Sequence, residues 1–470
     1  MPSLPPTTVR SSSASPGTAG AGAVLAATLP EALRALLTPH CAAACYRAHT
    51  AHARGQPAKL SAWQLVLALV SQALAGSGSL ALHVFRMTKT SLSAAALAQR
   101  RRTAGGNVCA AILEAALHPV AEPLRHPGAF VAGLRLVAID GTEHSLANTP
   151  GVLARLRKAA SRRASAAFAK LRSCVLLELH AHNPLRAVAG LHGESELALA
   201  RTLFSHIPAQ ALVLLDRLYG VPLVVAELQR ALAGKGSHLL VRVRANIKVK
   251  VERVLREGSA LISVPVPQPG VPRRRWRQLT LREIRGEVRR PGGTGSAVRL
   301  WTTLTDEKSA PATELLALYA QRWEHELFYR ELKSVLQGGS TLLRGQHVES
   351  AAQELAAVFL AAALLARTRC GTAAELGTDV PRVSLRRVLA LVEPLWLVLS
   401  VAEGILSHAQ QTALVAGVQS LLEREALLPP RRARSSPRAV RAPVSKWPRL
   451  LTRTHTTGAP SLKIIRAKNS

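Results

Sequence analysis

The spacing of hydrophobic residues changes along the chain and divides it into regions. From Leu29 to about Val120 apolar residues recur at helical intervals, with helices expected at Trp63–Ala75 and Ala94–Arg102. We therefore expect an all-helical N-terminal domain at residues 26–128. Residues 1–25 are rich in Ser, Pro, Gly and Ala without periodicity, which indicates a disordered arm.

After Pro127 short apolar runs bounded by turn residues replace the helical pattern, as is typical of β-strands. Strands are expected at Leu134–Asp140, Cys174–His180, Ala187–Leu191, Leu212–Asp216 and His238–Arg244. Helical stretches occur at Leu197–His206 and Val221–Leu232. Strands interleaved with helices predict an α/β fold for residues 129–244, the first part of a core domain.

Residues 245–300 alternate apolar side chains with cations, as at Ile247, Lys248, Val249 and Lys250. The alternation predicts a β-rich insertion with one cationic face, and an ordinary solvated face would give the same pattern. Helical periodicity returns from Thr313 to about Glu425. We assign 301–395 to the second part of the core and 396–430 to C-terminal helices.

The charge balance points to a polyanionic partner. The chain of 470 residues has 61 Lys and Arg against 28 Asp and Glu, a formal net charge of +33, while 48% of its residues are hydrophobic. This composition indicates a folded basic protein rather than a disordered one. Residues 431–470 carry eight Arg and three Lys with no acid, which predicts a basic tail that contacts phosphates. We expect DNA as the partner and no membrane, because no basic amphipathic helix or lipidation motif is evident.

The five cysteines are too few and too scattered for a disulfide framework, which favours a reducing, cytoplasmic location close to the nucleoid. Cys41, Cys45, His49 and His52 recur at intervals that could share one helix face. Zinc is one interpretation of this group. A partly buried helix face is the favoured one, because closed zinc sites usually take ligands from separate segments.

Aspartate is rare in this chain and occurs only at Asp140, Asp216, Asp306 and Asp379. Asp140 and Asp216 each end an apolar strand, where a carboxylate costs several kcal/mol to desolvate unless it is paired or bound to a metal. We therefore expect a cation between these two acids.

A third acid lies on the helix predicted over residues 318–333. At about 100° per residue, one face of this helix presents a carboxylate among cations and a phenol. The residues on this face are Tyr319, Arg322, Glu326, Arg330 and Lys333. A solvated helix with salt bridges would show a similar face.

These features together resemble the signature of the DDE transposases of bacterial insertion sequences, in the insertion sequence 4 family. That signature is a Tyr, Arg, Glu and Lys separated by two, three and six residues, and it is matched by Tyr319, Arg322, Glu326 and Lys333. Ile-Asp140-Gly-Thr and Leu-Leu-Asp216-Arg match the two aspartates of the family. The resemblance is strong over residues 130–345 and weaker in the N-terminal helices and the tail.

The resemblance implies an α/β ribonuclease-H-like core, a mixed five-stranded sheet with flanking helices, interrupted by the β-rich insertion. Asp140, Asp216 and Glu326 would be the catalytic residues and would hold two Mg²⁺ ions, for which Mn²⁺ can substitute. Two such ions stabilise both the attacking and the leaving oxygen of a displacement at phosphorus. The resemblance further implies that Arg322 and Lys333 grip neighbouring phosphates and that Tyr319 offers a hydroxyl to the same backbone.

Arg330 belongs to the same predicted DNA-contacting face, and two tryptophans extend it. Relatives stack an extruded base on tryptophans at places such as Trp301 and Trp323, although core packing is the commoner fate of this residue. Both are therefore candidate DNA contacts.

The function expected is that of a transposase. It would bind double-stranded DNA at the terminal inverted repeats as a homodimer on paired ends, nick each 3′ end and join it to target DNA. One alternative is a catalytically inactive or domesticated DNA-binding relative, against which the presence of all three acids speaks. The other is a ribonuclease-H-like nuclease without strand transfer.

Overall fold

The computed structural model describes residues 25–50, 59–158, 166–289, 295–337, 342–430, 434–435, 456–457 and 461–465. The N-terminal arm predicted at 1–25, apart from Leu25, and most of the basic tail lie outside the described residues.

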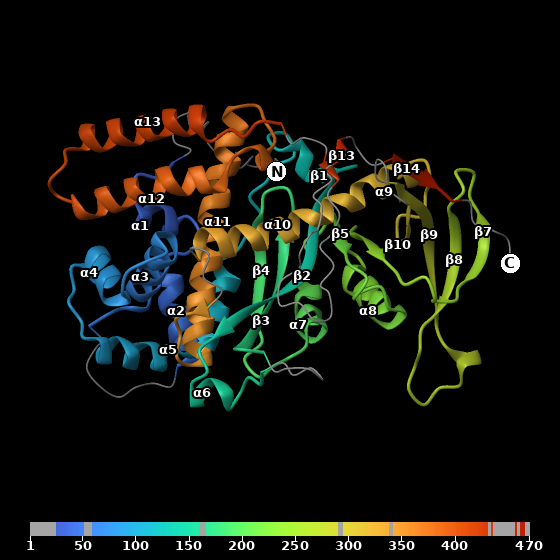
Figure 1. Ribbon diagram of the computed structural model, residues 1–470, viewed down its shortest axis with the longest axis horizontal. Helices are drawn as coiled ribbons and strands as arrows, with labels where there is room; N and C mark the ends of the chain where they lie inside the picture. Colours follow the sequence, from blue (N-terminus) through green and yellow to red (C-terminus); the bar gives the residue numbers. More distant parts are fainter. Residues whose placement is uncertain are drawn as a thin grey trace, which may run out of the picture.

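Five strands of one larger mixed sheet form the centre of the molecule (Figure 1). Their order is β4, β3, β2, β5, β6, in which β2, β5 and β6 run parallel and β3 and β4 are antiparallel to their neighbours. The strands are β2 (Leu134–Leu146), β3 (Ala169–Glu178), β4 (Asn183–Ala189), β5 (Ala211–Leu215) and β6 (His238–Arg242). This arrangement, with helices on both faces, fits the expected ribonuclease-H-like core.

Both faces of this sheet are buried, which explains the unbroken apolar runs of its parallel strands. Alternate residues point to opposite faces, so Leu212 and Leu214 enter one hydrophobic cluster and Val213 and Leu215 enter the other. Helices α7 (Glu196–Leu203) and α8 (Pro222–Leu232) supply apolar side chains to the second cluster.

The predicted β-rich insertion continues this sheet rather than standing apart from it. Strand β10 pairs with both β6 and β9, and β8 and β7 follow outward (Figure 1). These strands are β7 (Lys250–Val254), β8 (Ala260–Pro265), β9 (Gln278–Arg289) and β10 (Ser296–Thr302). Near the C-terminus β14 (Ser461–Ile464) pairs with β9, so part of the predicted tail lies on the insertion.

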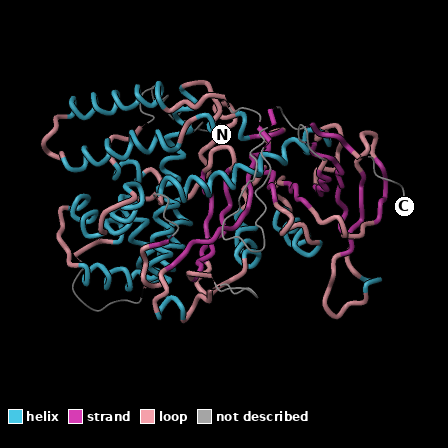
Figure 2. Tube along the Cα trace, viewed as in Figure 1, coloured by secondary structure: helices cyan, strands magenta, loops and turns pink. Residues whose placement is uncertain are grey.

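Helices from both ends of the chain form a lobe beside the sheet (Figures 1 and 2). The N-terminal helices are α1 (Leu29–Arg34), α2 (Pro39–His49), α3 (Ala62–Ala75), α4 (Leu80–Thr88) and α5 (Ala94–Ala116). The C-terminal ones are α11 (Val348–Glu375), α12 (Leu385–Val401) and α13 (His408–Glu425). Helix α11 contacts α3, α5, α12 and β4 and so joins the lobe to the sheet.

Part of the basic run on α5 serves this packing. Arg101 donates from Nη2 to the carbonyl of Ser350 at 2.6 Å and from Nε to Oε1 of Gln353 at 3.0 Å, both on α11. Arg102 remains exposed. The arginines of this run, Arg100–Arg102, therefore differ in their surroundings.

Helix α11 is longer than the apolar stretch evident in the sequence. In the part of the chain that the structure describes, it is the one unbroken helix long and apolar enough to cross a membrane, and 83% of its most apolar window is buried inside the protein. Burial of this kind is what a core helix requires.

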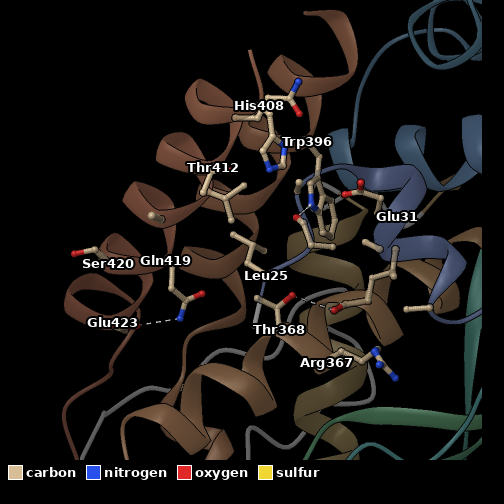
Figure 3. A pocket seen from close by; sticks show the side chains of 18 residues that line it. Leu25, Glu31, Arg367, Thr368, Trp396, His408, Thr412, Gln419, Ser420 and Glu423 are labelled. Atoms are coloured by element: carbon tan, nitrogen blue, oxygen red, sulfur yellow. Dashed lines mark hydrogen bonds between the residues drawn. The ribbon is translucent and has the colours of Figure 1, made fainter. Parts of the chain in front are cut away.

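The lobe also contains a pocket of about 670 Å³ (Figure 3). It lies between the segment from Leu25 to Ala35 and helices α11, α12 and α13, and Trp396 beside it donates from Nε1 to the carbonyl of Ala26 at 3.1 Å. None of the acids singled out by the sequence lines it.

Short elements complete the connections. They are α6 (Pro150–Leu153), β1 (Phe130–Val131), β11 (Leu342–Leu343), β12 (Arg434–Ser435) and β13 (Thr456–Thr457), with 3₁₀ turns at Pro127–Ala129, Phe204–His206, Arg273–Arg275 and Val380–Arg382. Strands β1 and β11 both pair with β2.

Candidate active site

Asp140 and Asp216 emerge at the same edge of the sheet. In the parallel pairing of β2 with β5, Ala138 lies opposite Leu214, and each aspartate follows two residues later. The N–H of Gly141 donates to Oδ1 of Asp140 at 2.9 Å, and the N–H of Leu218 donates to Oδ1 of Asp216 at 2.6 Å. These bonds hold the Asp140 carboxylate within β2, which continues to Leu146, and the Asp216 carboxylate directly after β5. The prediction that a strand ends at Asp140 is therefore wrong, because pairing with β3 extends β2 past it.

Glu326 reaches this edge from a helix that changes its pitch twice. Helix α9 (Ala312–Tyr319) passes through a 3₁₀ turn at Ala320–Arg322 into α10 (Trp323–Glu331), which ends in a π-helical turn at Leu332–Leu336. The sequence predicted one regular helical face here. Tighter and wider turns shift the side chains relative to that face, and π-helical turns are frequent at functional sites.

Arg322 joins the helix to the sheet. Its Nη2 lies 2.8 Å from Oε1 of Glu326, and its Nη1 lies 3.7 Å from Oδ2 of Asp140. Burial alone would lower the pKa of Arg322, but the hydrogen bond with Glu326 and the charge of Asp140 outweigh it, and the pKa is raised. Arg322 thus pairs with Asp140 and Glu326. A cation was expected between Asp140 and Asp216, and among the described residues no ion pair joins Arg322 to Asp216.

Other residues of the signature contact the same two strands. Tyr319 donates its hydroxyl to the carbonyl of Leu215 at 3.1 Å, directly before Asp216. Lys333 donates from Nζ to Oγ1 of Thr142 at 2.6 Å, two residues after Asp140. The spacing found in the sequence therefore gathers these side chains at one edge.

The electrostatics of this edge centre on Asp140. Burial and the negative charge of Glu196 raise the pKa of Asp140 to about 7, with a smaller contribution from Asp216, although Arg322 and the N–H of Gly141 oppose the shift. Burial also raises the pKa of Glu196. A cluster of carboxylates with one partnering arginine favours the approach of further positive charge.

The donor set fits divalent ions that prefer hard oxygen ligands. In the described parts of the chain, no three Asp, Glu, His or Cys side chains lie close enough to hold an ion by themselves. Mg²⁺ usually takes only one or two carboxylates and completes its shell with water and substrate phosphates. Asp140 and Asp216 on neighbouring strands, with Glu326 on the facing helix, suit that mode of binding.

The remaining candidates differ in exposure. Arg330 and Trp323 are exposed, and the guanidinium of Arg322 lies 5.9 Å from the centroid of the Trp323 ring. Trp301 is fully buried in β10, and its indole N–H donates to Oε2 of Glu283 at 2.9 Å. In this conformation Trp301 offers no ring face to a base, which corrects the expectation of a stacking role and makes it a core residue.

Sequence reasoning missed Glu196 and two tyrosines at this edge. Tyr329 donates its hydroxyl to the carbonyl of Asp140 at 2.6 Å, and Tyr219 donates its hydroxyl to Oε1 of Glu196 at 2.9 Å. Glu196 opens α7, where an acid usually satisfies the helix dipole. Only the tertiary fold brings it beside Asp140, so its spacing in the sequence carried no signal.

A buried ionic network holds the back of α10. Both ring nitrogens of His182 face carboxylates, Nδ1 at 2.6 Å from Oε2 of Glu331 and Nε2 at 3.0 Å from Oε2 of Glu324. Nη1 of Arg369 on α11 lies 3.2 Å from the same Glu331 oxygen. The network ties the Glu326-bearing helix to the β3–β4 turn and to the lobe.

Among the described members of the cysteine and histidine group, Cys41, Cys45 and His49 on α2, no metal-binding cluster is formed. Cys41 and Cys45 are partly buried against the helical core, His49 is exposed, and His52 lies outside the described residues. The favoured interpretation, a partly buried helix face, agrees with the placement of the two cysteines.

Comparison with known proteins places these residues in a family. Residues 132–364 match the family model described as "Transposase DDE domain". Over 231 residues the chain is 30% identical to Transposase InsG for insertion sequence element IS4 of Escherichia coli (strain K12). This match covers 49% of the chain and spans about half, 51%, of that relative.

A fold comparison finds a cryo-EM structure of the piggyBac transposase synaptic complex with hairpin DNA. Its TM-score is 0.43 at 9% sequence identity, with 86% of each chain covered. The family match encloses Asp140, Asp216, Glu326 and the whole Tyr, Arg, Glu and Lys signature. Over residues 132–364 the chain has a transposase DDE domain, and its identity to the insertion sequence 4 relative supports a DDE transposase of that family.

Proposed function

We propose that this protein binds the terminal inverted repeats of its insertion sequence and catalyses metal-dependent 3′-end nicking and strand transfer. One observation carries the proposal. Arg322 contacts both Asp140 and Glu326 at the sheet edge where Asp216 emerges, so the three acids and the basic residues of the signature converge.

The proposed catalytic residues are Asp140, Asp216 and Glu326, which would together hold two divalent ions, Mg²⁺ or in its place Mn²⁺. Such ions, when bound, supply a nucleophilic hydroxide and neutralise charge on phosphoryl oxygens. Arg322 would exchange its contact with Asp140 for a phosphate of the DNA, and Lys333 would hold a second phosphate. Tyr319, whose hydroxyl is bonded to the carbonyl of Leu215, would align the DNA strand that carries these phosphates.

Two displacements at phosphorus account for the products. In the first, a water oxygen attacks the phosphorus that joins the element to its flank, and the bond from phosphorus to O3′ breaks. The element then carries a free 3′-OH and the flank a 5′-phosphate. In the second, this 3′-OH attacks a phosphorus of target DNA and displaces the 3′-oxygen of the target strand.

An arginine-lined pocket beside the acids supports a path for DNA. The pocket, of about 440 Å³, is lined by four arginines from β6, β9, β10 and the residue after Asp216, namely Arg217, Arg242, Arg285 and Arg299. Arg285 and Arg299 pair with Glu283, whereas Arg217 and Arg242 form no ion pair with an acid in the described parts of the chain. With a net charge of +33, such a surface suits a phosphate backbone. The proposed partners are two DNA ends held by a homodimer in the nucleoid.

A strand-transfer assay tests this function. Purified protein is incubated with Mg²⁺ and target plasmid, together with either an intact duplex that spans the repeat boundary or a pre-nicked duplex that ends in the inverted repeat. Covalent joining of the 3′-OH strand to the plasmid is the expected result. Nicking without joining would identify a nuclease, and specific end binding without either reaction would identify an inactive DNA-binding relative.

A further inference from the structure

Glu196 faces the site that has been described but belongs to none of the motifs of the family signature. Its helix begins there, with Oγ of Ser195 accepting the N–H of Ala198 at 3.2 Å. The side chain does not extend into solvent. A Cβ built on Gly141 would lie 2.5 Å from Cγ, 2.6 Å from Cδ and 2.8 Å from Oε2 of Glu196.

These distances place the Glu196 carboxylate directly on the residue that follows Asp140. Glycine at position 141 is therefore required by close approach rather than by its backbone angle. The N–H of the same glycine donates to Oδ1 of Asp140 at 2.9 Å. The carboxylates of Asp140 and Glu196 therefore both lie against Gly141.

The second oxygen of Glu196 is anchored from the other catalytic strand. Tyr219, fully buried, donates its hydroxyl to Oε1 of Glu196 at 2.9 Å. The N–H of Tyr219 donates to the carbonyl of Asp216 at 3.2 Å. Glu196 is thus connected to both strands that carry the aspartates, with its side chain against Gly141 of β2 and its Oε1 bonded to Tyr219, which follows β5.

In the parts of the chain that the structure describes, Arg172 opposes the rise in the pKa of Glu196, but its effect is smaller than that of burial. Glu196 takes part in no ion pair there, and the nearby Arg172 pairs instead with Glu143. A partly buried acid fixed beside two others is unfavourable unless a cation binds among them. An acid that served only to interact with the helix dipole at the start of α7 could do so with its carboxylate exposed to solvent.

We propose that Glu196 is a fourth carboxylate of the ion site, positioned by Tyr219 to bind the divalent ion on the Asp140 side. The proposal rests on the ion site of the proposed function. It adds a ligand from α7 to the three acids of the signature, and it assigns Tyr219 the role of a positioning residue.

Mn²⁺ binding to the full-length, DNA-free protein tests this assignment, measured by calorimetry and by electron paramagnetic resonance of free Mn²⁺. Glu196→Gln keeps an oxygen that can accept from Tyr219 but removes the charge. We expect its Mn²⁺ affinity to fall by about tenfold or more, and that of Tyr219→Phe to fall less, as for groups that orient a ligand. Glu194→Gln, a change of the same kind in the preceding loop, should bind Mn²⁺ as the wild type does.

Two further variants separate the failure of this inference from that of the proposed function. Asp140→Asn and Asp216→Asn should both lose Mn²⁺ binding. If they do and Glu196→Gln binds Mn²⁺ like the wild type, Glu196 is a structural helix-start residue and the inference is overturned. If neither aspartate variant changes Mn²⁺ binding, the ion site itself is wrong.

Folding of each variant is checked by circular dichroism before titration. Should Glu196→Gln not fold, Glu196→Asp provides the same decision, because it keeps the charge and withdraws the carboxylate by one methylene. Weaker Mn²⁺ binding by Glu196→Asp supports the assignment of Glu196 as a ligand, and unchanged binding overturns it.

Discussion

Arg322 contacts two acids that are proposed to bind ions, so its guanidinium competes with those ions for the carboxylates. Removing the guanidinium should reveal this competition. We expect Arg322→Met to destabilise the ion-free protein by about 1 to 3 kcal/mol, because it leaves partly buried carboxylates without their hydrogen-bonding cation. Added Mn²⁺ should then raise the melting temperature of the variant more than that of the wild type. Thermal denaturation with and without Mn²⁺ measures both effects.

The matched control is Arg330→Met on the exposed side of the same helix, which should melt like the wild type under both conditions. Equal melting temperatures for Arg322→Met and the wild type without ions would show that Arg322 does not stabilise the acids.

Lys333 makes a different contribution, because its ammonium contacts Thr142 rather than an acid. We expect Lys333→Met to lower the single-turnover rate of end nicking by about 10²-fold, since a cation aimed at the reacting phosphate is lost. Mn²⁺ affinity should stay unchanged. Thr142→Val removes only the hydrogen bond and should cost less. An unchanged nicking rate of Lys333→Met at saturating DNA would show that Lys333 contributes to DNA binding and not to the reaction.

At the scale of elements, the sequence identified the acids but not everything that positions them. Asp140 and Asp216 were found because acids rarely follow apolar strands, and Glu326 because its neighbours matched a spaced signature. The 3₁₀ and π-helical turns around α10 escaped prediction, since regular periodicity assumes one pitch. The sequence left both fates of Trp301 open, with core packing the commoner one, because its pattern does not reveal that β10 lies inside the sheet.

The network behind α10 makes stability depend on pH. Burial raises the pKa of Glu331, but Arg369 and His182 more than compensate and lower it from 4.5 to about 2. Burial likewise opposes protonation of His182, but Glu331 and Glu324 outweigh it and raise its pKa above 6.5. The Glu331 contribution is therefore complete above about pH 4.5 and lost toward pH 2. The His182 contribution is complete below about pH 6.5 and lost as the pH rises through its folded pKa.

We accordingly expect Glu331→Gln to destabilise the protein by about 3 kcal/mol near pH 5.5, where both contributions are present. The difference from the wild type should shrink at pH 9 and at pH 2.5. Urea denaturation at the three pH values tests this. Glu349→Gln, which breaks a surface pair with Arg155, should show a small and pH-independent effect. A Glu331→Gln difference that stays constant with pH would contradict the network.

The two tryptophans should respond in opposite ways. Trp301→Ala should cost about 3 to 5 kcal/mol of stability, because it empties a fully buried site in the sheet. Trp323→Ala, at a residue 44% exposed, should leave the melting temperature almost unchanged but impair a step after nicking that needs an unstacked base. An abasic substrate should then partly restore that step. Trp323→Ala protein that is unstable, with no block at a particular step, would make Trp323 a core residue.

At the scale of the whole molecule, the predicted segments proved to be interleaved. The β-rich insertion extends the central sheet through β10, and the N- and C-terminal helices share one lobe around α11. Local patterns gave the type of most of these elements. They could not give this assembly, because pairing between β6 and β10 and packing between α3 and α11 depend on contacts far apart in the sequence. For the same reason, no local pattern in the sequence predicts that Glu196 lies beside Asp140.

Asp140, Asp216 and Glu326, from separate elements, are proposed to act as one catalytic set. The direct measurement is Mg²⁺-dependent 3′ nicking at the repeat boundary by Asp140→Asn, Asp216→Asn and Glu326→Gln. Asp306→Asn, the same chemical change at an exposed turn, serves as the control. We predict a loss of about 10³-fold or more for each of the three, with end binding retained and the control active. Substantial nicking by any one of the three variants would contradict the account.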